Sequence, residues 1–256
     1  MNSRVLAATV VALSCPAAIG CGGIGSSPTP TSVVMVDASG STKNLQGEFK
    51  PAITDAIIKT AENEGQLWAA GGDNAVLANA VWNIDGKKFT APSEGEALKV
   101  EDLKLMGKQA ANSPEAKKLL LRTNRQGSDL VGLLKMAGDV FSAHPDGTRS
   151  LLFLTDGGIN EMGVDLFTNP PRDSAAGEKV IQTFVDKGLI AKGSLSGPKG
   201  KPVKVWLCGV GRGAAGNGGL TALYVQNFWK QLITFAGGEV VSEAPSCSSL
   251  GGFASS

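Results

Sequence analysis

The chain has 256 residues, of which 42% are hydrophobic and 34 are glycine, and its formal net charge is +1. This length and apolar content suit one large domain with a full core and do not fit a mostly disordered chain. A nearly neutral chain also lacks the clustered basic surface that gathers nucleic acid or an anionic membrane, so we expect neither as a partner.

The first twenty residues have the pattern of an export signal. A single Arg4 precedes the apolar stretch 5–13, and small residues then lead to Cys21. The stretch is too short for a permanent membrane span, which needs about 20 apolar residues. The residues Ala-Ile-Gly-Cys at 18–21 resemble the lipobox of bacterial lipoproteins, which implies cleavage before Cys21 and a lipid anchor on the outer face of the cell membrane. Cys15 ends a competing lipobox.

Strands and helices alternate along the domain that we expect at 32–242. The predicted strands are 32–36, 66–70, 78–84, 150–155, 203–210 and 239–241. The predicted helices are 42–64, 100–109, 114–122, 129–143, 174–187 and 220–236. Thr42 is the predicted N-cap of the first helix. This alternation predicts an α/β fold with a doubly wound, mostly parallel sheet flanked by helices on both faces. The segment 21–31 is predicted as a flexible tether, and 243–256 as a mobile C-terminal tail held, if at all, by Cys247.

Two cysteines remain for the folded domain if export removes Cys15 and lipidation takes Cys21. They are Cys208 and Cys247, an even pair in an oxidising compartment. A disulfide between them is one interpretation. The other is that Cys208, inside an apolar strand, is a buried thiol, and the sequence favours neither.

Hard oxygen ligands follow two of the predicted strands. Asp37, Ser39 and Ser41 alternate on the loop after the first strand, and Asp156 ends the strand 150–155. Carboxylates and hydroxyls suit Mg²⁺ or Mn²⁺ rather than a soft metal. Because ligands bind beyond the carboxyl ends of parallel strands, the two segments can form one site. The alternative is that the serines cap the following helix.

Three motifs together resemble the metal-ion-dependent adhesion site of the von Willebrand factor A family. They are Asp-Ala-Ser-Gly-Ser at 37–41, Gly-Ser-Asp-Leu at 127–130 and Thr-Asp-Gly at 155–157. The resemblance covers nearly all of the domain. Ser128 stands where the family usually has threonine, and it can also be a helix N-cap. Thr123 is another candidate from the same loop.

The resemblance implies a role for each candidate ligand. Ser39, Ser41 and Ser128 would coordinate Mg²⁺ or Mn²⁺ directly, while Asp37 and Asp156 would act mainly through water or by orienting the hydroxyls. One coordination position would stay open for an acidic side chain of a partner protein. The sequence is therefore interpreted as an extracytoplasmic binding or adhesion module and not as an enzyme.

The docking surface for such a partner would consist of glycine-rich loops around the site. These loops are 71–76, 157–169 and 211–219, and their composition does not identify the partner.

Two other classes of function use similar residues. Phosphatases of the haloacid dehalogenase type also place a nucleophilic aspartate after the first strand, with Mg²⁺ beside it, but they need a second aspartate where Ser39 stands. A serine hydrolase would need a Gly-x-Ser-x-Gly turn and a catalytic histidine, and the only histidine, His144, precedes a proline in a predicted turn. A scaffold that binds no metal is the third alternative.

Overall fold

The computed structural model describes residues 28–72, 82–83, 95–120, 129–197, 200–213, 219–244, 246–247 and 251–254. The strands are β1 (Thr31–Asp37), β2 (Gln66–Gly72), β3 (Trp82–Asn83), β4 (Arg149–Leu154), β5 (Asn160–Glu161), β6 (Val164–Asp165), β7 (Val203–Cys208) and β8 (Gly238–Ala244). The helices are η1 (Gly40–Leu45), α1 (Gln46–Glu62), α2 (Glu96–Ala111), α3 (Pro114–Leu120), α4 (Leu130–Ala143), α5 (Ser174–Asp186) and α6 (Gly219–Phe235). Most of the strand predicted at 78–84 lies outside the described residues.

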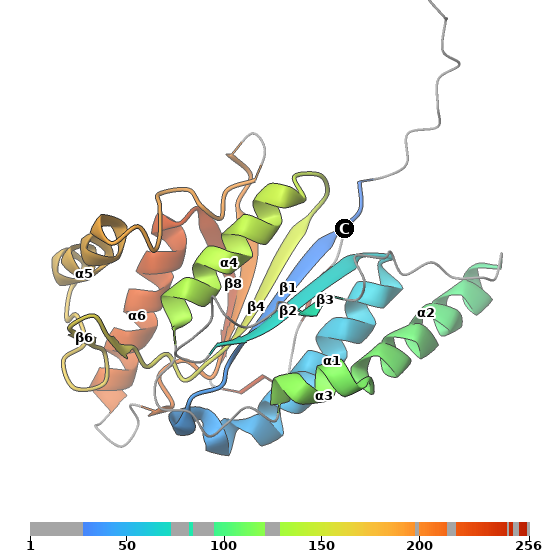
Figure 1. Ribbon diagram of the computed structural model, residues 1–256, viewed down its shortest axis with the longest axis horizontal. Helices are drawn as coiled ribbons and strands as arrows, with labels where there is room; N and C mark the ends of the chain where they lie inside the picture. Colours follow the sequence, from blue (N-terminus) through green and yellow to red (C-terminus); the bar gives the residue numbers. More distant parts are fainter. Residues whose placement is uncertain are drawn as a thin grey trace, which may run out of the picture.

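Six of the strands form one sheet in the order β3-β2-β1-β4-β7-β8 (Figure 1). Strands β2, β1, β4, β7 and β8 pair in parallel, and β3 pairs antiparallel with β2 at one edge. Strand β1 lies in the middle of the sheet, and later strands are added on both sides of it. The predicted α/β fold with a doubly wound, mostly parallel sheet is confirmed.

Helices cover both faces of this sheet, as the buried strand β1 requires. Its side chains alternate, so that Val33 and Met35 pack into the core cluster that contains α4, α5 and α6. Val34 and Val36 pack on the opposite face, in the cluster that contains α1. Helix α2 packs against α1 farther from the sheet, and α3 contacts α1, α2 and strand β2 (Figure 1). Continuous apolar residues in β1 therefore follow from burial on both sides.

The C-terminal segment 243–256 was predicted as a mobile tail held, if at all, by Cys247, and its described residues pack on the domain. Strand β8 continues to Ala244, and Phe253 is buried with its ring centre 5.2 Å from that of Trp206. The Trp206 indole also donates a hydrogen bond to the Gly251 carbonyl, at 3.2 Å. The aromatic ring of Phe253 gives this otherwise polar segment enough apolar area to pack onto the sheet.

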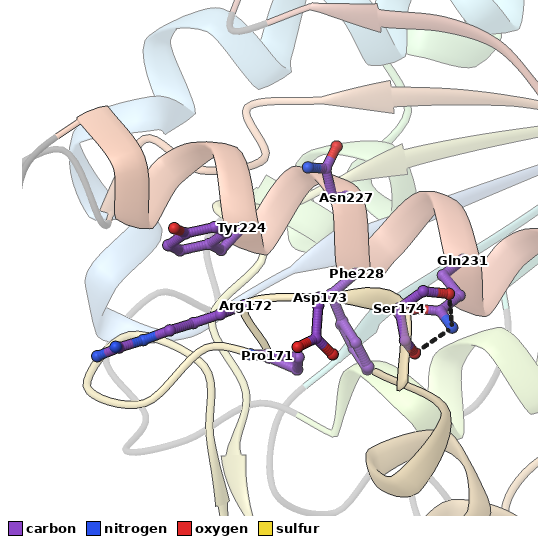
Figure 2. Close-up of a pocket in the computed structure, with 8 residues that line it drawn as sticks. All are labelled: Pro171, Arg172, Asp173, Ser174, Tyr224, Asn227, Phe228 and Gln231. Carbon is purple, nitrogen blue, oxygen red and sulfur yellow. Dashed lines mark hydrogen bonds between the residues drawn. The ribbon is translucent and has the colours of Figure 1, made fainter. Parts of the chain in front are cut away.

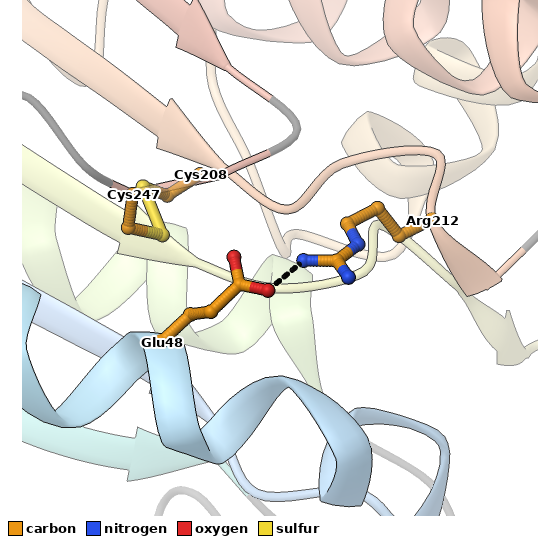
Figure 3. Close-up of a disulfide and its surroundings, with 4 residues drawn as sticks. All are labelled: Glu48, Cys208, Arg212 and Cys247. Carbon is orange, nitrogen blue, oxygen red and sulfur yellow. Dashed lines mark hydrogen bonds and ion pairs between the residues drawn. A yellow bond between two sulfur atoms is a disulfide. The ribbon is translucent and has the colours of Figure 1, made fainter.

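A disulfide joins Cys208 at the end of β7 to Cys247 in this C-terminal segment (Figure 3). The two Cα atoms lie 5.3 Å apart. The disulfide interpretation is confirmed over the buried thiol.

The predicted export signal, Cys15 and Cys21 lie outside the described residues. Among the residues that are described, no helix is long and apolar enough to span a bilayer.

Candidate metal centre

The predicted ligands from two segments meet at the carboxyl edge of the sheet. Asp37 is the last residue of β1, and Asp156 follows β4, which pairs in parallel with β1. Both aspartates and Ser39 are buried, whereas Ser41 is exposed. The site therefore lies directly beneath the surface, with its acids inside and a hydroxyl at its outer side.

The carboxylate of Asp37 is held by hydrogen bonds at both oxygens. Its Oδ1 accepts from the backbone N–H of Ser39 at 2.9 Å, and its Oδ2 accepts from the hydroxyl of Thr155 at 2.8 Å. Thr155 is itself fixed, because its backbone N–H donates to the carbonyl of Cys208 at 3.0 Å. No role was predicted for Thr155 from the sequence, although it stands directly before Asp156 in the Thr-Asp-Gly motif.

The hydroxyls of Ser39 and Ser41 lie 2.9 Å apart and hydrogen-bond to each other. Ser39 occupies the N-cap position of η1, yet its side chain makes no capping hydrogen bond. The helix-capping alternative therefore does not account for its hydroxyl.

Thr42 was predicted as the helix N-cap, but it lies inside η1. Its buried hydroxyl donates to the carbonyls of Asp37 and Ser39, both at 2.9 Å. These bonds stiffen the loop that carries Ser39 and Ser41. The N-cap prediction failed because the chain first forms a 3-10 turn, and α1 begins only at Gln46.

Asp156 has one satisfied and one unsatisfied oxygen. Its Oδ1 accepts from the backbone N–H of Gly158 at 3.0 Å. Its Oδ2 is buried and has no hydrogen-bond partner among the described residues. A buried, unpaired carboxylate oxygen is costly and needs an explanation, of which an ion or an ordered water is one.

Two of the loops predicted around the site meet at Asp156. A Cβ atom added to Gly213 would lie 2.8 Å from Asp156 Oδ2 and 2.6 Å from the ring of Phe167. Any side chain at Gly213 would collide with one of them. The glycine thus lets the loop after β7 approach the carboxylate closely.

Burial raises the pKa values of both acids. The pKa of Asp37 is raised to about 7, first by burial and then by the charge of Asp156, against the hydrogen bonds from Ser39 and Thr155. Burial also raises the pKa of Asp156, which the Ser41 hydroxyl and the Gly158 amide lower in part. No Lys or Arg is among the groups that shift either pKa. The two acids therefore lack a compensating positive charge from described side chains.

The donor set fits a hard divalent cation. It consists of two carboxylates and two hydroxyls, and no cluster of three or more His, Cys, Asp or Glu side chains exists within the described residues. A site with so few charged ligands suits Mg²⁺ or Mn²⁺, which retain water molecules, better than zinc.

The third predicted contribution, Ser128, lies outside the described residues, as does Thr123. The neighbouring Asp129 is the N-cap of α4, and its carboxylate accepts from the Gly132 N–H at 2.7 Å. The capping role considered for Ser128 thus belongs to Asp129. Because a short connection leads from α4 into β4, α4 begins at the carboxyl edge of the sheet, where Asp37 and Asp156 lie (Figure 1).

A separate pocket of about 280 Å³ lies between the start of α5 and α6 (Figure 2). Its lining residues are Pro171, Arg172, Asp173, Ser174, Tyr224, Asn227, Phe228 and Gln231. The Gln231 amide donates to the Ser174 carbonyl at 2.9 Å, and Asp173 caps α5 by accepting from Ala176 at 2.8 Å. Gln231 thus joins α6 to α5, and Asp173 caps α5. Asp173 is the one acid among these lining residues, so the pocket has no pair of acids like Asp37 and Asp156.

Comparison with known proteins assigns no family to the chain. No family model and no curated protein matches it. Two crystal forms of proximal thread matrix protein 1 from the mussel byssus are similar, with 13% sequence identity and a TM-score of 0.38. The match covers 87% of this chain but only 45% or 44% of that protein, so the chain spans less than half of its length. Similarity at this level identifies neither family nor function.

Proposed function

We propose that the chain is an exported binding module of the von Willebrand factor A type, anchored to the outer face of the cell membrane by a lipid on Cys21. It holds Mg²⁺ or Mn²⁺ with Asp37, Ser39, Ser41, Ser128 and Asp156. The ion binds a partner protein by accepting an acidic side chain of that partner as its last ligand.

The observation that carries this proposal is the pair of buried acids, Asp37 and Asp156. Burial makes both acids costly to ionise, and one oxygen of Asp156 has no described hydrogen-bond partner. Burying uncompensated charge destabilises a fold by several kcal/mol unless a counter-ion is present. A divalent cation supplies the two positive charges that this pair lacks.

The geometry also favours the roles expected from the family resemblance. Each oxygen of Asp37 accepts one hydrogen bond, from Ser39 or from Thr155, so this acid orients the Ser39 loop and keeps a lone pair on each oxygen for water or the ion. The hydroxyl of buried Ser39 hydrogen-bonds to the hydroxyl of exposed Ser41, which links the acids to the surface. When bound, the ion supplies a positive centre that attracts a carboxylate.

A phosphatase-like enzyme is the alternative from another functional class. It would use Asp37 as a nucleophile, but hydrogen bonds to both of its oxygens lower its reactivity, and Ser39 cannot handle protons as an acid would. We expect the purified chain to hydrolyse no p-nitrophenyl phosphate in millimolar Mg²⁺. Turnover that Asp37→Asn abolishes would favour the enzyme.

Thermal unfolding tests the cation site directly. After EDTA treatment and dialysis, Mg²⁺ or Mn²⁺ at about 100 times its dissociation constant should stabilise the chain by about 2.7 kcal/mol. This corresponds to a rise in melting temperature of roughly 5–10 °C for a domain of this size. Asp156→Asn should abolish the rise, whereas Asp139→Asn, an exposed acid on α4, should retain it. Equal melting of the wild type with and without cation would contradict the proposal and favour the metal-free scaffold.

Fractionation and affinity capture test the anchor and the partner. Cys21→Ala should release the protein from the membrane fraction, and Cys15→Ala should leave it there; the reverse result would assign the anchor to Cys15. A pull-down from the cell envelope should recover a protein partner in Mg²⁺ and lose it in EDTA. Recovery that EDTA leaves unchanged would contradict cation-dependent binding.

A further inference from the structure

The pocket between the start of α5 and α6 is a second candidate site, and none of its lining residues belongs to the candidate metal centre (Figure 2). Its volume of about 280 Å³ lies just below the range of about 300–1,000 Å³ that is typical of pockets for drug-sized ligands. The pocket therefore suits one small ring, either as a free molecule or as one unit of a longer chain.

Two aromatic side chains of α6 supply the apolar part of the lining. Phe228 is 2% exposed, and its ring packs edge-on against Phe184 and Trp229, with ring centres 6.5 Å and 6.4 Å away. Tyr224, about one turn earlier on α6, is half-buried and lies at one end of the pocket (Figure 2). The Tyr224 ring stacks on no other aromatic ring among the described residues, so it is available to pack against a ligand.

Hydrogen bonds within the domain hold the two walls of the pocket in place. The Gln231 amide of α6 donates to the carbonyl and to the hydroxyl of Ser174, at 2.9 Å and 3.2 Å. Asp173 caps α5 with one oxygen, which accepts from the Ala176 N–H at 2.8 Å. The pocket is therefore formed before a ligand binds, which lowers the entropy cost of binding.

Three other polar side chains of the lining have hydrogen-bonding capacity that the described residues do not use. Arg172, Tyr224 and Asn227 form no hydrogen bond or ion pair within the described part of the chain. Arg172 can only donate, whereas the Tyr224 hydroxyl and the Asn227 amide can both donate and accept. The oxygen of Asp173 that does not cap α5 is a further acceptor. Donors and acceptors thus stand together around an aromatic surface.

The charges of the lining balance each other, which selects against a charged ligand. Arg172 is the one base and Asp173 the one acid among the lining residues. An anion would be attracted by Arg172 but repelled by Asp173, and a cation would meet the reverse. A purely apolar ligand would cover polar groups without hydrogen-bonding to them, which is costly. A neutral ring that carries several hydroxyl groups avoids both costs.

We infer that the pocket binds a neutral sugar in its pyranose form, either free or as one unit of a glycan. The C–H face of the sugar ring packs on Tyr224. Its hydroxyls form hydrogen bonds with Arg172, Asp173 and Asn227. This site does not depend on the candidate metal centre and gives the domain a second class of ligand.

Tyr224 is the only tyrosine in the chain, so a tyrosine label reports on this pocket alone. The chain with ¹³C-labelled tyrosine is titrated with the methyl glycosides of glucose, galactose, mannose and N-acetylglucosamine. We expect at least one of them to shift the Tyr224 ring signals, with a dissociation constant on the order of millimolar because the contacts are few. The same sugar should give NOE contacts between its C–H groups and the Tyr224 ring. Tighter binding of its tetrasaccharide would assign a glycan as the source, and weaker binding a free sugar.

A variant with a matched control locates the sugar in the pocket. Asn227→Ala should weaken sugar binding by about fivefold, because it removes one hydrogen-bonding partner. The control is Asn112→Ala, at an exposed asparagine that ends α2, which should leave sugar binding unchanged. Both variants should keep the wild-type melting temperature. Sugar binding should be equal in Mg²⁺ and in EDTA, and it should not change between about 0.1 M and about 1 M salt.

Three results would overturn the inference. The first is that none of the four glycosides shifts the Tyr224 signals. The second is unchanged sugar binding by Asn227→Ala, which would place the sugar elsewhere on the domain. The third is that inorganic phosphate or benzoate binds at Tyr224 more tightly than every glycoside, which would show that Arg172 dominates and that the pocket takes an anion. None of these results bears on the cation site, which the thermal unfolding with Mg²⁺ tests separately.

Discussion

Replacing Asp37 with asparagine is expected to stabilise the protein in the absence of cation and to remove its response to Mg²⁺. Asparagine is nearly the same size, and its carbonyl oxygen can still accept from the Ser39 N–H. Its amide can donate to the Thr155 hydroxyl, which reverses the direction of the existing bond. The substitution therefore removes a buried charge next to Asp156, keeps the hydrogen bond from Ser39 and weakens the contact with Thr155.

The pKa of Asp37 gives the size and the pH range of this effect. The pKa is raised from 3.8 to about 7 in the folded state. At about 1.4 kcal/mol per pH unit, ionised Asp37 destabilises the folded state by roughly 4 kcal/mol. This cost is absent below the unfolded-state pKa, grows as pH rises, and is complete above the folded-state pKa. Because the introduced asparagine is an imperfect partner for Thr155, we expect a net gain of about 2 kcal/mol at about pH 8.

Urea unfolding in EDTA, at about pH 8 and about pH 4, measures this difference. The variant should be more stable than the wild type at the higher pH and nearly equal to it at the lower pH, where the cost of ionising Asp37 has almost vanished. Asp139→Asn serves as the control, because that acid is exposed on α4. A variant that is less stable than the wild type at about pH 8 would refute the reasoning, since the carboxylate would then contribute stability without a cation.

Three further outcomes are expected. Thr155→Val should lower Mg²⁺ affinity by about tenfold in calorimetry, because the valine cannot donate a hydrogen bond to the carboxylate of Asp37 and such a bond to a charged group is worth about 1.5–3 kcal/mol. The control is Thr60→Val, at a buried threonine within α1, which should leave the Mg²⁺ affinity unchanged. Affinity for Mg²⁺ should rise with pH by up to about tenfold per pH unit below about pH 7 and level off above it, because ion binding displaces the proton of Asp37. An affinity that does not change with pH would show that no proton is displaced from Asp37. Cys247→Ser removes the disulfide to Cys208, which joins residues 39 positions apart, and should lower the free energy of unfolding measured in urea by about 4 kcal/mol. An unchanged free energy of unfolding would show that packing alone holds the C-terminal segment.

The fold could be predicted from sequence because its elements have strong local signals. Buried strands such as β1 and β4 are short apolar runs, and helices such as α4 have a clear apolar face. The hairpin β5–β6 was not predicted, because two-residue strands have no periodicity to detect. The packing of the C-terminal segment was also missed, since it depends on a contact between Phe253 and Trp206, which lie far apart in sequence.

The site could be predicted in outline for a topological reason. Asp37 and Asp156 follow parallel strands, and once β1 and β4 are neighbours their carboxyl ends must meet. The supporting residues could not be predicted in the same way. Thr155 holds an acid 118 positions away, and the role of Gly213 follows from the path of a loop. Such contacts leave no periodic or spacing signal in the sequence.

Under the proposed function, the order of the groups from the core to the surface would favour the binding of an external ligand. Asp37, Asp156 and Ser39 are buried, and the Ser39 hydroxyl hydrogen-bonds to the hydroxyl of the exposed Ser41. A cation held mainly by neutral hydroxyls keeps most of its charge toward the open side, because the acids compensate it only from behind. Its affinity for an external carboxylate is then greater than in a site where the acids coordinate directly. Thr155 takes part in this arrangement, because it donates a hydrogen bond to the second oxygen of Asp37 and so fixes the orientation of that acid.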